Sequence, residues 1–162
     1  MRTVLDLNAA LGQMWTAMDD SKFEVSYLGL DWAPNIMDIV GQTFPLIDGS
    51  ESHVVPPLCW ANPSVPFDLG KSFDVVISIV SGGQFVKKRR EGWYLDNLLR
   101  PAGDTIVVAW RTDVDVVEEM RKRGAEYDES ATAELSKASK IDFHRNHIKV
   151  FRLQGGGRII AQ

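Results

Sequence analysis

The chain has 162 residues, 44% of them hydrophobic and 25% charged, which is enough for one domain with a substantial core. Its formal net charge of -4 excludes a general attraction to nucleic acid or to an anionic membrane. The single cysteine, Cys59, excludes an internal disulfide and a multi-cysteine metal site, and the longest apolar run, Val75–Val80, is too short to cross a bilayer. Asp6 and Asn8 interrupt any signal-peptide core, so we expect a single cytoplasmic domain over residues 1–162.

The first elements form a pattern that indicates a ligand. Thr3–Leu7 is predicted to be a buried strand, a loop of small residues follows, and Gly12–Asp20 has the apolar spacing of a helix. Phe23–Leu30 is then predicted to be a second strand, closed by the acid Asp31. In α/β folds, small loop residues let the backbone approach a nucleoside-containing ligand, and the acid accepts hydrogen bonds from two ribose hydroxyls.

The middle of the chain alternates between loop and regular structure. Phe73–Val80 is the clearest buried strand because it is β-branched and bounded by Ser81-Gly82-Gly83. The remaining predictions, in order, are a short helix over Asn35–Val40, loop over 41–72 with a short strand near Val54-Val55, and a helix over Gln84–Leu99 that breaks at Gly92.

Thr105–Trp110 is predicted to be another buried strand, and Val114–Arg123 an amphipathic helix with acids first and basic residues last. Ile148–Leu153 alternates in polarity, and three glycines lead from it to Arg158–Ile160, which indicates an antiparallel hairpin. We therefore expect an α/β fold: a doubly wound, mostly parallel sheet with helices on both faces and a C-terminal antiparallel hairpin.

Four segments, taken together, resemble the class I S-adenosylmethionine-dependent methyltransferases, which have a Rossmann-like fold. In chain order they are Asp6–Gly12, Gly29–Met37, Val65–Val76 and Tyr94–Gly103. They stand where that family has its acid and glycine loop, its second-strand acid, the approach to its fourth strand, and the turn before its fifth. The resemblance implies methyl transfer from S-adenosylmethionine, with S-adenosylhomocysteine as product, to an acceptor that the sequence does not identify.

The glycine loop departs from the family pattern. Asn8 and Ala10 stand in place of the first two glycines and only Gly12 remains, so the loop is degenerate. Asparagine is among the residues that best tolerate left-handed backbone, while alanine adds a methyl group where the ligand must approach. Two functions stay open: a compact methyltransferase, or a non-catalytic relative that serves as a binding or partner subunit. A nicotinamide-dependent Rossmann enzyme ranks lower because its glycines are spaced Gly-x-Gly-x-x-Gly.

The resemblance implies roles for particular residues, each with a structural alternative. Asp31 would hold the cofactor ribose, or cap the helix that follows. Asp6 would orient the loop or reach the amino-acid part of the cofactor, or be satisfied by loop amides. Asn62 would accept from the adenine amino group, or serve as a turn residue before proline. Trp32 would pack against adenine, or cover a local apolar patch.

The end of the fourth strand is predicted to face the crevice in which a doubly wound sheet binds its ligand. Ser78 would lie beside the methionine part of the cofactor and Ser81 near the substrate, although both also suit a tight turn. The basic run that follows would contact acidic groups or nucleic acid, with Trp93 and Tyr94 as stacking surfaces, or form a solvated helix face, which we favour. Its members are Lys87, Lys88, Arg89 and Arg90.

We expect no metal site, because His53, His144 and His147 have no ligand spacing with Cys59 or with one another. The first strand begins next to Met1, whereas many members of the family place helices before it. The resemblance therefore predicts an open site that a large substrate, a second copy of the chain or a partner protein closes.

Overall fold

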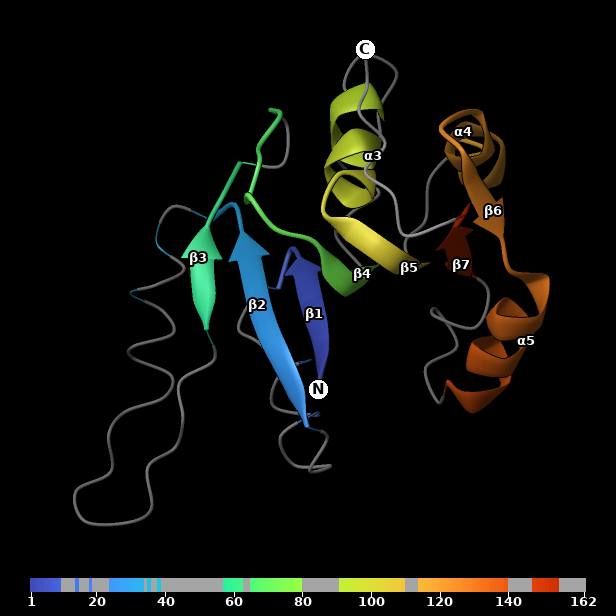
Figure 1. Cartoon of the computed structure of the whole chain (residues 1–162), viewed down its shortest axis with the longest axis horizontal. Coiled ribbons are helices and arrows are strands. Elements are labelled where there is room, and N and C mark those ends of the chain that lie inside the picture. Colours follow the sequence, from blue (N-terminus) through green and yellow to red (C-terminus); the bar gives the residue numbers. More distant parts are fainter. Residues whose placement is uncertain are drawn as a thin grey trace.

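The computed structural model describes residues 1–9, 14, 18, 24–33, 35, 38, 57–62, 65–79, 91–109, 114–139 and 147–154. These residues form one seven-stranded sheet in the order β3-β2-β1-β4-β5-β7-β6 (Figure 1). The strands are β1 (Arg2–Leu7), β2 (Val25–Asp31), β3 (Leu58–Trp60), β4 (Phe73–Ile79), β5 (Ala102–Ala109), β6 (Ala125–Tyr127) and β7 (Ile148–Leu153). The first five strands are parallel, and β7 is antiparallel to both β5 and β6.

Helices cover both faces of the sheet. Among the described residues the helices are α3 (Glu91–Leu99), α4 (Val116–Lys122) and α5 (Glu129–Ala138). On one face, Tyr94 of α3 and Met120 of α4 are fully buried in the main core, together with Leu5 and Ile106 of the strands. On the other face, α5 packs through Ala131 beside β7, and Met14 and Met18 pack beside β1 and β2. The doubly wound, mostly parallel sheet that the sequence predicts is confirmed.

Helix ends follow the local sequence. Asp115 caps α4, where its side chain accepts from the Glu118 amide at 3.1 Å, and Asp128 caps α5 by accepting from the Ala131 amide at 2.9 Å. Gly124 stops the helical run with a φ of 84°, which glycine adopts without steric cost. No helix among the described residues is long and apolar enough to cross a membrane.

The antiparallel pair at the C-terminal edge differs in detail from the expected hairpin. β7 pairs with β6, which lies before it in the chain, and α5 occupies part of the connection between them. The predicted partner, Arg158–Ile160, lies outside the described residues, as do Val54-Val55; the described edge strand β3 runs over Leu58–Trp60. α3 runs over Glu91–Leu99 and includes Gly92 as its second residue, while the first part of the predicted helix, 84–90, lies outside the described residues.

The connections of the sheet define where a ligand can reach it. From β1 the chain proceeds to β2 and β3 on one side, then returns to β4 and β5 on the other side. The strand order therefore reverses between β1 and β4, and open α/β sheets bind ligands at the carboxyl ends of the strands at such a point.

Candidate functional site

Two carboxylates lie on one face of the sheet near the point where the strand order reverses. Asp31 is the last residue of β2 and is 6% exposed, and Asp6 of β1 is 5% exposed. Asp6 stands opposite Gly29, two residues before Asp31. Because side chains alternate along a strand, Gly29 and Asp31 share the face on which Asp6 lies.

Gly29 keeps this face closely packed. A Cβ atom at this position would lie 2.7 Å from the Ala9 Cβ, closer still to the Leu58 Cδ2, and 3.2 Å from the Tyr27 hydroxyl. Only glycine therefore lets β1, β2 and β3 approach as they do beside the carboxylates.

Asp6 is held by a tyrosine of the neighbouring strand. The Tyr27 hydroxyl donates to Asp6 Oδ2 at 2.8 Å. Burial raises the pKa of Asp6 to about 7; the Tyr27 hydrogen bond opposes this shift and the nearby Asp31 carboxylate adds to it. Burial and the adjacent Asp6 raise the pKa of Tyr27, so its hydroxyl keeps its proton. Near neutral pH, Asp6 is therefore poised to take up or release a proton.

The loop after β1 turns at Asn8. This residue has a φ of 69°, the left-handed region, and the amides of Asn8 and Ala9 both donate to the Leu30 carbonyl, at 2.8 and 3.0 Å. These bonds fasten the turn to the end of β2. The loop thus makes the backbone conformation typical of glycine with an asparagine.

A buried hydrogen-bonded chain crosses the point of strand reversal. Asn8 Nδ2 donates to the Tyr94 hydroxyl at 2.7 Å, and that hydroxyl lies 2.5 Å from the Ser78 Oγ on β4. All three side chains are buried, and burial raises the pKa of Tyr94. Tyr94 of α3 therefore joins the end of β1 to the end of β4, and we call these three side chains the hydrogen-bonded floor.

Two tryptophans stand beside Asp31. Trp60 at the end of β3 is 57% exposed, Trp32 is 43% exposed, and the Trp60 indole donates to the Trp32 carbonyl at 3.0 Å. Asp31 Oδ1 accepts from the Ala33 amide at 2.9 Å, which holds the carboxylate at the strand end. The site thus combines a buried acid with an exposed aromatic surface, a pairing suited to a ligand with a polar sugar and a flat ring.

The structure brings together several of the residues that the sequence singles out. Asp6, Asn8, Asp31 and Ser78 lie at the carboxyl ends of β1, β2 and β4, while Trp32 follows β2 and the exposed Asn62 follows β3. The other candidates lie outside the described residues: Ala10, Gly12, Ser81, Lys87, Lys88, Arg89 and Arg90.

The predicted stacking role of Tyr94 is wrong, and two residues of the site, Tyr27 and Trp60, are new. Tyr94 is fully buried, so it offers no stacking surface, whereas Trp93 is 48% exposed. Sequence reasoning misses the structural role of Tyr94, the Tyr27 bond to Asp6 and the exposure of Trp60. Alternation along β2 places Tyr27 on the face of Asp31 and was the available signal for it.

No protein-family model and no curated protein matches this chain. Solved structures do resemble it. A chain of the complex between the Haloferax volcanii Trm112 methyltransferase activator and the putative methyltransferase is 17% identical, with a TM-score of 0.64 over 95% of this chain and 83% of that chain. The TehB-like SAM-dependent methyltransferase from Corynebacterium glutamicum is 21% identical, with a TM-score of 0.64 over 94% of this chain and 80% of its own.

The antibiotic-resistance methyltransferase Kmr is 12% identical, with a TM-score of 0.66 over 95% of this chain and 87% of its own. At these identities the likeness establishes the fold. The chain has the Rossmann-like fold of class I S-adenosylmethionine-dependent methyltransferases, as the sequence predicts.

Proposed function

We propose that this protein transfers a methyl group from S-adenosylmethionine, which it binds across the carboxyl ends of β1, β2 and β4. The observation that carries the proposal is Asp31, a buried carboxylate at the end of β2 beside the reversal of strand order. Neighbours of the same fold have been crystallised with S-adenosylmethionine, S-adenosylhomocysteine or sinefungin.

The residues present fit such a ligand. A carboxylate has about four acceptor positions. The Ala33 amide uses Asp31 Oδ1, and we assign further positions on this carboxylate to the two ribose hydroxyls. We assign the surface for the adenine ring to Trp32 and Trp60, and the contact with the adenine amino group to the exposed Asn62, two residues beyond β3.

Asp6 is the acid nearest the turn at Asn8, and we assign it to the charged amino-acid part of the cofactor. With a pKa of about 7, it ionises readily when a cationic group comes near. The amides of Asn8 and Ala9 both donate to the Leu30 carbonyl, which holds the turn in place. We assign the backbone of this turn to one side of the ligand. The Tyr94 hydroxyl accepts from the Asn8 side chain and is hydrogen-bonded to Ser78, which holds this loop in place.

When bound, S-adenosylmethionine supplies a methyl group on a sulfonium: the acceptor's lone pair forms the new bond to carbon, the carbon–sulfur pair stays on sulfur, and the acceptor's proton passes to solvent. The protein's part is to position the two reactants and to exclude water. The hydrogen-bonded floor of Asn8, Tyr94 and Ser78 gives this positioning its rigidity.

Isothermal titration with S-adenosylhomocysteine tests the proposal. We expect the wild-type protein to bind, and Asp31→Ala to bind at least about 10-fold more weakly, because each hydrogen bond to a charged group contributes about 1.5–3 kcal/mol. Glu134→Ala, which removes an exposed carboxylate from α5, is the matched control and should bind like wild type. Absence of heat at millimolar ligand, or an unchanged affinity in a folded Asp31→Ala variant, would overturn the proposal.

A further inference from the structure

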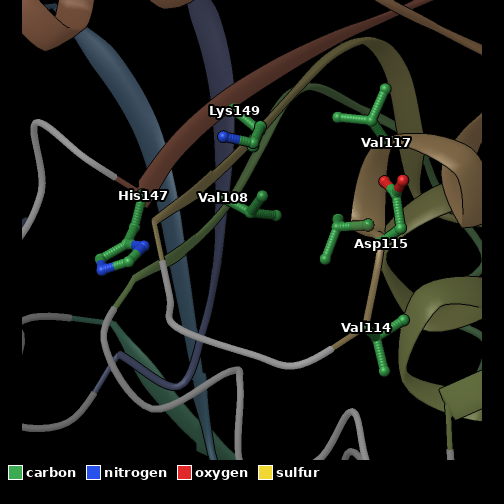
Figure 2. Close-up of a pocket in the computed structure, with 7 residues that line it drawn as sticks. Val108, Val114, Asp115, Val117, His147 and Lys149 are labelled. Carbon is green, nitrogen blue, oxygen red and sulfur yellow. The ribbon is translucent and has the colours of Figure 1, made fainter.

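A separate hollow lies at the same edge of the sheet, between the end of β5, the start of β7 and the start of α4. It has a volume of about 180 Å³. Figure 2 shows His147 and Lys149 on its β7 side, Val114, Asp115 and Val117 on its α4 side, and Val108 between them. We call it the β5–β7 hollow.

The wall of the β5–β7 hollow is divided about equally between apolar and polar surface. Val108, Val114, Val116 and Val117 form the apolar part, and Val108 and Val116 are themselves 1% and 7% exposed. These side chains belong to the same layer as the main core, so this part of the wall is held in place by packing from behind. The apolar part of the wall favours an apolar group of matching size.

One side of the hollow carries nitrogen-bearing side chains. Lys149 stands opposite Val108 in the β5–β7 ladder, which puts both side chains on the α4 face of the sheet. Within the described ranges Lys149 forms no ion pair. His147 lies two residues before it and also lines the hollow. The Asp115 carboxylate accepts from the Glu118 amide, so it is used as the α4 cap. The positive side chain of Lys149 is thus the group available for a ligand charge.

The size and place of the hollow define the ligand further. An apolar cavity of about 150 Å³ holds one benzene molecule, so the volume here suits one ring with a small substituent. β5 lies two strands from β1 in the sheet, a separation of about 10 Å. The hollow lies on the α4 face of the sheet, whereas Asp6 and Asp31 lie on the opposite face, so it is a site separate from those carboxylates.

We propose that the β5–β7 hollow is a binding site for a small carboxylate with a single-ring apolar body. Its ring contacts the valines, and its carboxylate pairs with Lys149 beside His147. This binding does not depend on the methyl transfer proposed above.

Benzoate is the probe, and its binding is followed through backbone amide shifts in ¹H–¹⁵N spectra of the full chain. We expect saturable shifts at Val108, Val117 and Lys149, with benzamide, the neutral analogue, and benzylammonium, the cationic one, at least 10-fold weaker. Lys149→Met should weaken benzoate at least 10-fold. The matched control Lys137→Met, on the exposed side of α5, should leave it unchanged.

A second variant fills the hollow. Val117→Phe should abolish benzoate binding while the rest of the spectrum remains that of the folded protein. Shifts absent or scattered over the surface, equal binding of benzylammonium, or unchanged binding by either hollow variant would each overturn the proposal. Titration of S-adenosylhomocysteine into the same sample separates the two proposals. Benzoate binding without any binding of the nucleoside supports the hollow as a carboxylate site and overturns methyl transfer.

Discussion

In the first half of the sheet, from β1 to β4, two carboxylates lie almost entirely out of solvent, whereas several acids from α3 onward lie nearer the surface and pair with arginines. Asp6 and Asp31 are 5% and 6% exposed, and the hydrogen bond to Asp6 comes from a tyrosine. Among the described residues no lysine or arginine pairs with Asp6. Burial of a carboxylate in this way costs free energy of folding, so its presence here indicates a use beyond folding.

Several acids of the second half pair with cations of the same half. Arg123 binds Asp96 at 3.0 Å and Glu119 at 2.8 Å, which joins α3 to α4. Arg152 of β7 binds Asp128, the cap of α5, at 3.0 Å. The fold itself gives these acids a role, and the contrast supports our assignment of ligand binding to the carboxylates of β1 and β2.

The largest expected effect concerns Asp6 and pH. Its pKa is raised from 3.8 to about 7, so between these values the folded protein holds a proton that the unfolded chain has lost. Stability therefore falls as pH rises from about 4 to about 7. Asp6→Asn should remove this slope and be more stable than wild type at pH 8 by up to about 4 kcal/mol. Urea denaturation at a series of pH values measures the difference.

Asp128 should contribute a dependence of stability on pH opposite to that of Asp6. Its pKa is lowered, first by the Ala131 amide and then by Arg152, so it stabilises the fold above the ordinary carboxyl value and loses that contribution as pH falls through the lowered pKa. Asp128→Asn should therefore lose stability relative to wild type above about pH 4. If both substitutions changed the dependence of stability on pH in the same direction, the contrast between the two halves would be contradicted.

The next effect tests the packing that brings the carboxylates together. Gly29→Ala places a methyl group against Leu58 and Ala9, and we expect it to cost about 3 kcal/mol in the free energy of unfolding. Gly92→Ala in α3 is the matched control, because its Cβ would meet only Arg123 Nη2, at 3.9 Å. That variant should gain up to about 1 kcal/mol. Equal costs in chemical denaturation would show that the first half is no more tightly constrained than the second.

Tyr94→Phe tests the link between β1 and β4. Loss of the hydroxyl leaves the Asn8 amide and the Ser78 hydroxyl buried without this partner, at a cost of about 2 kcal/mol. It should also weaken S-adenosylhomocysteine binding, because the turn at Asn8 loses its support. Tyr127→Phe on β6 is the control and should change stability by less than about 0.5 kcal/mol. A Tyr94→Phe variant as stable as wild type would argue against a fixed floor.

The smallest effect belongs to the ion pairs of the second half. Arg123→Met should cost about 1 kcal/mol, because partly exposed pairs contribute little. Arg121→Met, whose pair with Glu118 is more exposed, should cost less still. Thermal denaturation compares the two. A loss as large as that from Gly29→Ala would contradict the view that these pairs are peripheral.

The sequence predicts the strands that are buried on both faces, because such strands are continuous apolar runs. β4 and β5 are examples. It does not predict β6, which has three residues and only one of them buried, since that strand depends on its pairing with β7. α5 is mostly exposed and polar, so its apolar spacing is weak, although Asp128 gives it a cap.

The candidate site likewise has residues that the local sequence predicts and contacts that depend on distant parts of the chain. Asp31 follows from its place at a strand end, which local sequence reveals. The contact of Asn8 with Tyr94 joins residues 86 positions apart, and no local pattern carries that information. The β5–β7 hollow likewise depends on the antiparallel register of Val108 and Lys149.

Asn8 has a consequence for how this loop is held. Its backbone occupies the left-handed conformation that glycine adopts without steric cost, and its side-chain amide fastens the turn to α3, on the opposite side of the strand order's reversal. Replacement by glycine would relax the backbone yet remove this bond. The asparagine thus exchanges backbone freedom for a side-chain anchor, and a sequence pattern that requires glycine at this position does not recognise a loop of this kind.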